Sequence, residues 1–263
     1  MATVDITHVL RSGGFALGGL LFGSFLTVVV HRTPRRQSIV APRSACPGCG
    51  AVIRARDNVP VVSYLLLGGK CRSCRSPIAA EYPLIEAVTA ALFVCSALVY
   101  RSTWVAAIVA AFLGVMVAAA VIDVHHRIIP NSVTYPSLAL FAALLVGARV
   151  AGADVSLSDA AIGLAAFGGS LLLVAVVSPR GMGMGDVKLA ALIGMVLGAL
   201  GIRYVAVAAL AGVLAGGAGG VVALVLGRSR KDTLPFGPFL AAGAVVSALL
   251  GPQVAGWYAG LLR

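Results

Sequence analysis

Residues 104–123, WVAAIVAAFLGVMVAAAVID, decide the fold of this 263-residue chain. The 19 residues from Trp104 to Ile122 carry no charge, and Asp123 follows them directly. A helix needs about 20 predominantly apolar residues to cross the hydrocarbon core of a bilayer. The stretch is therefore predicted to be a membrane-spanning helix that ends at a carboxylate.

The composition extends this prediction to the whole chain. Hydrophobic residues make up 60% and charged residues 11%, with a mean hydropathy of +1.01, whereas soluble proteins carry about 25% charged residues. The sequence predicts an all-α polytopic membrane protein of about eight transmembrane helices. The expected spans are about 13–30, 83–100, 104–122, 133–150, 160–178, 187–201, 204–227 and 236–261. The first has no evident cleavage site after it, which favours a retained helix over a signal peptide.

The basic residues predict how this protein is oriented. With the N-terminus outside, the inside segments are 31–82, 123–132, 179–188 and 228–235, and they hold 15 of the 20 Lys and Arg residues. The positive-inside rule favours this orientation over its inverse. It places Asp123 and Asp186 at the cytoplasmic border of the membrane.

The net charge of +11 fits the same topology. Basic loops next to a membrane bind the anionic lipids of the inner leaflet. Nucleic acid is not a predicted partner, because aromatic and basic residues are not interleaved on a soluble surface. The oligomeric state cannot be predicted from these patterns.

Four cysteines in the long inside loop form two C-x-x-C pairs, Cys46 with Cys49 and Cys71 with Cys74. Each pair can place two thiolates on one tetrahedral metal ion, and the pattern is close to that of a zinc ribbon. The alternatives are two disulfides or free thiols, but disulfides are rare in the reducing cytoplasm. The predicted zinc site is structural, since four thiolates leave no open position. Cys95 is expected to be a small buried hydrophobe.

Two carboxylates lie at predicted span borders, where charge is costly unless it is used or paired. Asp186 follows the glycine-rich stretch Gly181–Gly185 and could simply be a helix N-cap. Asp123 ends a span, where the helix dipole disfavours an anion, and His125, His126 or Arg127 could pair with it. Together the aspartates suggest an aspartyl hydrolase acting on a membrane-embedded substrate.

The chain resembles the type IV prepilin peptidases, which are bacterial membrane aspartyl proteases with a Gly-x-Gly-Asp signature. The resemblance runs over almost the whole length. Its carriers are Gly23-Ser24-Phe25-Leu26, His31-Arg32, Pro42-Arg43-Ser44 with the first cysteine pair, Val62-Ser63-Tyr64, Gly68-Gly69-Lys70-Cys71, Tyr82-Pro83, Glu86, Asp123, Ile129-Pro130, Gly183-Met184-Gly185-Asp186 and Pro235-Phe236-Gly237-Pro238. Thr27 departs from the family, which commonly has Asn at that position.

The resemblance implies a function and a division of the chain. Such enzymes remove the basic leader of prepilins and pseudopilins at the cytoplasmic face of the inner membrane, and many then methylate the new N-terminus with S-adenosylmethionine. Asp123 and Asp186 match the catalytic positions, while Gly69 and Lys70 match a position linked with methyl transfer. The expected parts are a first transmembrane helix (1–31), a cytoplasmic cysteine loop (32–82) and a seven-helix peptidase core (83–263).

Helix dipoles suggest unequal roles for the two aspartates. Asp186, at a helix start, is the expected base, and Asp123, at a helix end, is the expected acid. Gly183 and Gly185 are expected to let the backbone approach an extended substrate, although packing of small residues is an alternative. For Gly194, Gly198 and the cluster within 212–220, we expect packing alone.

Three alternatives remain at this stage. The chain could be a protease without methyl transfer, because no glycine-rich nucleotide fingerprint accompanies the cysteine loop. It could be a proton-coupled transporter that uses both carboxylates, although internal repeats are not evident. It could also be a zinc-stabilised assembly subunit in which the aspartates are dispensable.

Overall fold

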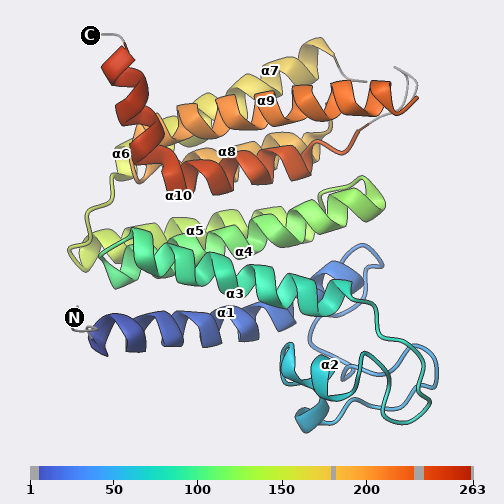
Figure 1. Cartoon of the computed structure of the whole chain (residues 1–263). Coiled ribbons are helices and arrows are strands. Elements are labelled where there is room, and N and C mark those ends of the chain that lie inside the picture. Colours follow the sequence, from blue (N-terminus) through green and yellow to red (C-terminus); the bar gives the residue numbers. More distant parts are fainter. Residues whose placement is uncertain (1–5, 179–181, 228–233, 262–263) are drawn as a thin grey trace.

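Long helices packed side by side form the body of the protein (Figure 1). The computed structural model describes residues 6–178, 182–227 and 234–261. The long helices are α1 (Ile6–Arg32), α3 (Glu81–Val99), α4 (Thr103–His126), α5 (Asn131–Val150), α8 (Met184–Gly198), α9 (Ile202–Val225) and α10 (Gly237–Leu261). One further rod consists of α6 (Leu157–Gly163), the π-helical turn η2 (Leu164–Gly168) and α7 (Gly169–Val177). The cysteine loop holds only two short helices, η1 (Ala55–Asp57) and α2 (Val62–Leu66).

The predicted class of helical membrane protein is confirmed. Among the described residues, six helices are long and apolar enough to cross a bilayer, namely α1, α3, α4, α5, the rod Leu157–Val177 and α9. Helix α8 has only 15 residues, and the apolar part of α10 that is described, Gly237–Gly251, is also short. The exact number of eight spans therefore stays a prediction.

Helices α4 and α8 form the interior of the bundle. Helix α4 packs against α1, α3, α5 and α10, while α8 packs against α5, the rod from α6 to α7, α9 and α10. Most of α8 after its first turn is buried. Helices that are apolar all round belong in such an interior. Asp123 and Asp186 therefore extend from the two most enclosed helices.

Glycine seams bring the helices around α8 into close contact. A side chain at Gly194 or at Gly163 would meet the backbone carbonyl of the other, so α8 and α6 touch through their main chains. Gly198 faces the backbone of Asp159 in the same way. In α9, an added Cβ at Gly219 would meet the ring of Phe239. The predicted packing role is confirmed for Gly194 and Gly198 and, within 212–220, for Gly212, Gly216 and Gly219, whereas Gly217 and Gly220 have no neighbouring atom within 4 Å of a Cβ position.

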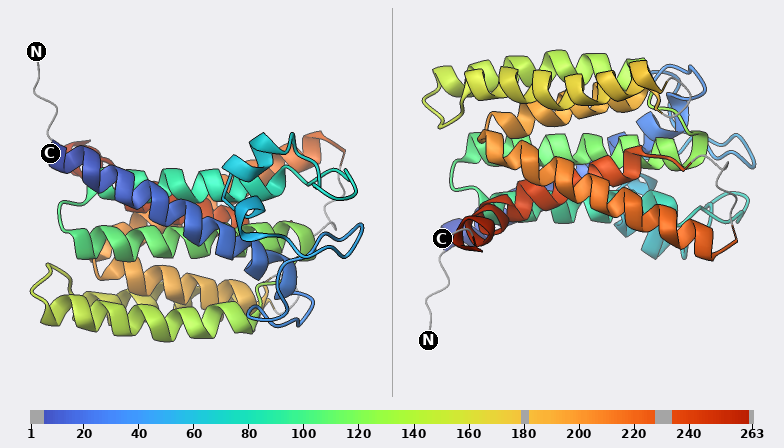
Figure 2. Two further views of the ribbon diagram at one scale, coloured as in Figure 1. Left: turned by 90° about the horizontal axis from the view of Figure 1, so that it is seen from below. Right: turned by 90° about the horizontal axis from the view of Figure 1, so that it is seen from above.

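The helices alternate in direction along the bundle (Figures 1 and 2). The ends of α1 and α4 and the starts of α3, α5, α8 and α10 lie at the end of the bundle that carries the cysteine loop. The start of α1 and the end of α10 lie at the opposite end. This alternation brings positions 123 and 186, which are far apart in the sequence, to one end of the molecule.

Candidate active site and metal centre

Asp123 lies in the last turn of α4 and is 5% exposed. The helix ends just beyond it because Arg127 adopts a left-handed conformation, with φ 53°, and donates its amide to the Asp123 carbonyl at 2.8 Å. The Asp123 side chain does not point to free solvent. Its Oδ2 accepts a hydrogen bond from the backbone N–H of Gly237, the first residue of α10, at 2.8 Å.

This hydrogen bond changes the electrostatic setting predicted for Asp123. The carboxylate lies at the C-terminal end of its own helix but also at the N-terminal end of α10, whose dipole favours an anion. The start of α10 thus offsets part of the unfavourable field from the end of α4, whereas Asp186 lies at a helix start alone. The assignment of Asp186 as base and Asp123 as acid stays a prediction.

Asp186 is a half-buried residue in the first turn of α8. The predicted span began at 187, but the helix begins at Met184, with Gly183 in the N-cap position. The Asp186 amide donates to the Gly183 carbonyl at 3.1 Å. Of the predicted glycine-rich stretch, Gly181 lies outside the described residues. The signature is thus the first turn of a helix and not a separate loop.

The two glycines of the signature have different surroundings. A Cβ at Gly185 would lie 2.9 Å from the Cβ of Ile129, so this glycine is required by packing within the protein. A Cβ at Gly183 would meet the Asp186 side chain, 3.2 Å away, and only one other atom, the Gly185 amide nitrogen. Of the two, Gly183 is the one whose open side faces the carboxylate.

Both carboxylates lie at the same end of the bundle (Figure 1). Three helix ends hold them: the end of α4, the start of α8 and the start of α10. On the outer side, the Lys188 Nζ donates to Asn131 Oδ1 at 2.6 Å and stands 4.7 Å from the centre of the Tyr135 ring. Lys188 therefore ties α8 to α5, a role that the sequence did not reveal.

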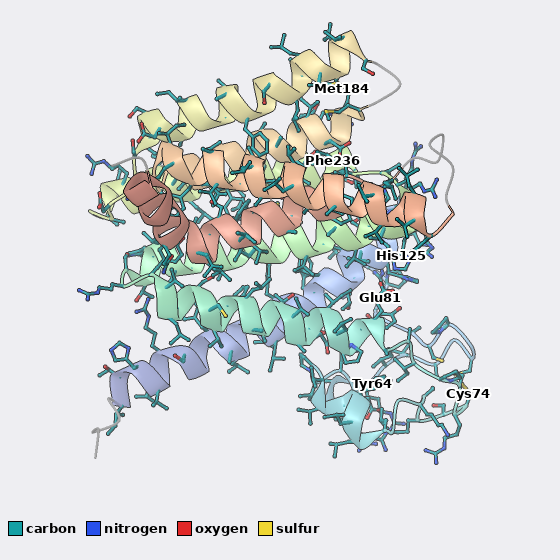
Figure 3. All side chains as sticks on the ribbon, turned by 45° about the horizontal axis from the view of Figure 1, so that its top comes forward. Tyr64, Cys74, Glu81, His125, Met184 and Phe236 are labelled. Carbon is teal, nitrogen blue, oxygen red and sulfur yellow. The ribbon has the colours of Figure 1, made fainter. Side chains whose placement is uncertain are left out.

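A pair between His125 and Asp123 was one alternative from the sequence, but His125 has another partner in the structure. Its Nε2 lies 2.9 Å from Oε2 of Glu81, the first residue of α3. Figure 3 shows Glu81 and His125 facing each other between their helices. This contact links α4 to α3, and Asp123 is left with a backbone partner.

The four cysteines of the loop between α1 and α3 come together. Their sulfur atoms all lie within 4.8 Å of one another, and the Sγ atoms of Cys46 and Cys74 are 3.8 Å apart. Zinc–sulfur bonds of 2.3 Å in a tetrahedron place sulfurs about 3.8 Å apart. None of these thiols forms a disulfide. The cluster fits zinc, and the disulfide alternative is wrong.

A hydroxyl group supports the thiolate form of this cluster. The Ser76 Oγ lies 3.1 Å from Cys74 Sγ and 3.6 Å from Cys46 Sγ. The Ser76 hydroxyl, followed by the amides of Gly48 and Cys49, lowers the pKa of the Cys46 thiol to about 6. Metals bind thiolates, so this environment makes Cys46 a ready ligand at neutral pH. The Ala51 backbone lowers the pKa of the Cys49 thiol, but contacts with Cys74 and Cys46 raise it to about 11.

The two cysteine pairs are built alike. In residues 45–52, the Cys46 amide donates to Ala51 and the Gly50 amide donates back to Cys46. In residues 70–77, Cys71 and Ser76 make the same bond, and the Arg75 amide donates to Cys71. Gly50, with φ 70°, and Arg75, with φ 62°, hold the equivalent left-handed position. Two copies of one turn thus face each other across the cluster.

Comparison with known proteins gives a match for each of two parts of the chain. Residues 17–100 match the bacterial peptidase A24 N-terminal domain, and residues 110–224 match the type IV leader peptidase family. A prepilin leader peptidase/N-methyltransferase of Burkholderia pseudomallei strain 1026b is 37% identical over 266 residues, which cover 89% of this chain and 83% of that protein. The chain belongs to the type IV leader peptidase family.

Two other relatives show the same extent of similarity. A prepilin leader peptidase/N-methyltransferase of Bacillus subtilis strain 168 is 34% identical over 241 residues, covering 91% of this chain and 94% of that protein. A type 4 prepilin-like proteins leader peptide-processing enzyme of Escherichia coli O78:H11 is 35% identical, covering 89% and 92%. No solved structure matches the chain.

In this leader peptidase the cysteine loop is docked on the bundle by specific polar contacts. The Arg32 guanidinium, at the end of α1, donates to the carbonyls of Ser38 and Pro42. Glu86 Oε2, in the second turn of α3, accepts from the Val61 amide at 2.7 Å. Glu86 therefore caps the start of α2.

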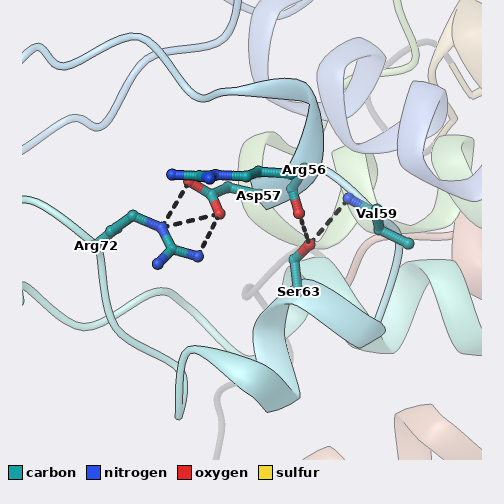
Figure 4. A network of polar contacts seen from close by, with 5 residues as sticks. All are labelled: Arg56, Asp57, Val59, Ser63 and Arg72. Atoms are coloured by element: carbon teal, nitrogen blue, oxygen red, sulfur yellow. Dashed lines mark hydrogen bonds and ion pairs between the residues drawn. The ribbon is translucent and has the colours of Figure 1, made fainter.

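A network within the loop supports α2 (Figure 4). Arg72 donates to both oxygens of Asp57, with contacts of 2.7 to 3.0 Å, and holds the pKa of that carboxyl below its usual range. The Ser63 hydroxyl donates to the Arg56 carbonyl at 3.1 Å and accepts from the Val59 amide at 3.0 Å. These contacts join the second cysteine turn, which contains Arg72, to η1 and α2.

Gly69 and Lys70 lie between α2 and the second cysteine turn. Gly69 has φ 67°, and its amide donates to the Tyr64 carbonyl at 2.9 Å. A Cβ at this position would lie 3.0 Å from the Tyr64 hydroxyl oxygen. Lys70 pairs with Pro77 in an isolated β-bridge, and its side chain is exposed. The backbone of Gly69 and Lys70 thus connects α2 to the second cysteine turn, and the absence of a side chain at Gly69 leaves room for the Tyr64 ring.

Proposed function

We propose that this leader peptidase is a membrane aspartyl endopeptidase that removes the basic leader of type IV prepilins and pseudopilins, with Asp123 and Asp186 as its catalytic residues. The observation that carries the proposal is the convergence of both carboxylates at one end of the bundle (Figure 1). The relatives named as prepilin-processing enzymes support the substrate class.

The chemistry follows from two carboxylates without a stronger nucleophile. One ionised aspartate removes a proton from water, and the resulting hydroxide attacks the scissile carbonyl carbon. The protonated partner donates to the carbonyl oxygen, and a proton then passes to the leaving amine. The Gly237 amide holds one Asp123 oxygen and leaves the other for the reaction. We place the extended substrate beside Gly183, whereas Gly185 supports the turn through Ile129.

We place this reaction at the cytoplasmic face of the bacterial inner membrane, with the N-terminus outside. The bundle end that holds both aspartates also carries the basic cysteine loop, and 15 of the 20 Lys and Arg residues fall in the segments assigned to that side. The same charge attracts anionic lipids. Of the basic loop 228–235, residues 228–233 lie outside the described residues.

The cysteine loop serves the second activity in this proposal, N-methylation of the new N-terminus by S-adenosylmethionine. The names of the B. pseudomallei and B. subtilis relatives support it. Zinc on Cys46, Cys49, Cys71 and Cys74 stabilises this loop, which has little apolar core of its own. In functional terms the chain divides into the first helix (1–31), the methyl-transfer loop (32–82) and the peptidase core (83–263), and Gly69 and Lys70 belong to the loop.

Separate Asp123→Asn and Asp186→Asn substitutions test the peptidase. Each should lower cleavage of a prepilin with a basic leader by about 10²- to 10⁴-fold, because a proton-transfer group is lost. The matched control is Asp154→Asn, which changes an exposed carboxylate in the connection between α5 and α6. The assay uses purified protein in detergent, with thermal unfolding as a check of the fold.

The same assay distinguishes the rival functions. Cleavage that persists in both aspartate variants would contradict the peptidase assignment and favour an assembly subunit. Proton-coupled transport that is lost in these variants, together with an absence of leader cleavage in the unmodified protein, would favour a transporter.

A further inference from the structure

A cavity of about 430 Å³ lies between the bundle and the cysteine loop. Val28 and His31 of α1, Tyr82 and Glu86 of α3, and Tyr64 of α2 contribute to its wall. Cavities of this size accept small-molecule ligands, typically with apolar walls and a few polar groups. Neither Asp123 nor Asp186 lines this cavity, so it is separate from the candidate catalytic residues.

We propose that this cavity binds the methyl donor, a nucleoside carrying a cationic sulfonium, and that Glu86 is the carboxylate that faces the sulfonium charge. The inference rests on the proposed N-methyltransferase activity and assigns its location.

Glu86 is the carboxylate in this region that has no cationic partner. It is 8% exposed and lies in the second turn of α3, where it accepts a hydrogen bond from the Val61 amide. Among the described residues no Lys, Arg or His forms an ion pair with it, whereas Asp57 pairs with Arg72 and Glu81 with His125. A buried carboxylate without a counter-charge is costly. A cationic ligand in the cavity lowers that cost.

Gly69 controls the shape of the same cavity through Tyr64. Tyr64 lines the cavity, and its hydroxyl and ring carbons occupy the space where a Gly69 Cβ would lie, at 3.0 to 3.4 Å. A side chain at 69 would therefore press on the Tyr64 ring, which would have to shift by a few tenths of an ångström. Gly68 offers a matched comparison, because it has a similar φ of 60° and no neighbouring atom within 4 Å of its Cβ position. Gly69 is thus a positioning residue.

A second cavity, of about 310 Å³, lies next to the first. The two cavities share the wall residues Thr27, His31, Ala79 and Tyr82. The second is also lined by His125 and His126, two and three residues beyond Asp123. The second cavity therefore borders both the proposed donor site and the end of α4.

The methyl transfer balances without a further reactant. The neutral amine uses its lone pair to form the N–C bond to the methyl carbon as the C–S bond breaks, and the C–S electron pair stays on sulfur. The positive charge moves from sulfonium to nitrogen, which leaves a neutral thioether and a methylammonium that releases a proton to water. Attraction by Glu86 therefore favours the donor over its product.

The charge argument is tested with Glu86→Gln, which keeps an acceptor for the Val61 amide. Binding of S-adenosylmethionine and of the neutral thioether S-adenosylhomocysteine is measured by calorimetry on the full chain in detergent. We expect the dissociation constant of the cation to rise about tenfold and that of the thioether to change less than about twofold. Equal changes for both compounds would overturn the role of Glu86. The role of Glu86 would also be overturned if Glu86→Gln changed only the KM of the leader substrate.

The location is tested with Gly69→Ala against Gly68→Ala, which introduce similar backbone strain. We expect Gly69→Ala to weaken binding of both compounds at least about tenfold and Gly68→Ala to leave it within about twofold. Equal weakening by the two variants, or no weakening by Gly69→Ala, would overturn the location. Zinc content verifies that each variant has a folded loop. If the unmodified protein cleaves leaders but binds neither compound, the proposed methyltransferase fails; binding that is insensitive to these variants refutes only the site.

Discussion

At the scale of single residues, backbone amides and glycines explain the aspartates better than charged partners do. Asp123 is held by the Gly237 amide, and a Cβ at Gly237 would lie 2.8 Å from the same carboxylate oxygen. His125, two residues away, is occupied by Glu81. The geometry of Asp123 thus depends on a residue more than a hundred positions later in the chain.

Gly237→Ala is therefore predicted to impair catalysis by displacing the Asp123 carboxylate. Cleavage should fall by about 10²-fold, since small misplacements of a catalytic group have effects of this size. Initial rates on a prepilin substrate measure it. Gly220→Ala is the control, because no atom lies within 4 Å of its Cβ position. A rate reduction of equal size in both variants would contradict the prediction.

At the scale of helices, close approach of main chains stabilises the short helix α8. This helix has only 15 residues. Glycines in α8 and in the rod that faces it lack side chains, so the two main chains can approach closely. Gly163 in α6 faces Gly194 in α8, and Gly168 in η2 faces Ala191. The π-helical turn occurs between these two contacts, so the irregular backbone is enclosed by the seam.

Gly194→Ala should destabilise the bundle by about 1–3 kcal/mol, the usual effect of overpacking. The added methyl group would collide with backbone atoms of α6, which cannot rotate away as a side chain can. Thermal or denaturant unfolding in detergent measures the change. Gly169→Ala, at an open position of α7, should be neutral or slightly stabilising. Similar destabilisation by both would show that the seam has no special role.

The cysteine loop is the element that depends on metal. Cys74→Ala should abolish stoichiometric zinc and make residues of the loop susceptible to limited proteolysis, because the remaining loop has few buried apolar residues. Removal of zinc with a chelator should have the same effect. Cys95→Ala changes a cysteine in α3 outside the cluster and should retain zinc. Full zinc content in the Cys74 variant would refute the four-thiolate site.

At the scale of the whole molecule, the two family-matched parts are joined at one end of the bundle. The Glu81–His125 contact joins α3 to α4, and the capping of α2 by Glu86 anchors the loop to α3. The aspartates, the cavities and the cysteine cluster consequently share that end. In the proposed orientation both activities face the cytoplasm.

Cysteine labelling in vesicles tests this orientation. A thiol introduced by Gln37→Cys should react from the cytoplasmic side with an impermeant maleimide, and one introduced by Asp154→Cys should react from the other side. Both positions are exposed and lie at opposite ends of the bundle. Labelling is compared with that of the unmodified chain, whose own cysteines provide the background. The reverse pattern would place the N-terminus inside.

The sequence by itself determined the membrane class, the two cysteine pairs and the candidate aspartates. These features depend on composition and on short spacings, which act locally whatever the rest of the chain does. Only the tertiary structure decided which groups meet: Asp123 with the start of α10, His125 with Glu81, Glu86 with Val61 and Tyr64 with the space at Gly69. The dipole argument was incomplete because it used only the helix that contains Asp123, and the assignment of base and acid stays a prediction. The field at a carboxylate comes from every helix end packed against it, and packing partners are not encoded in local spacing.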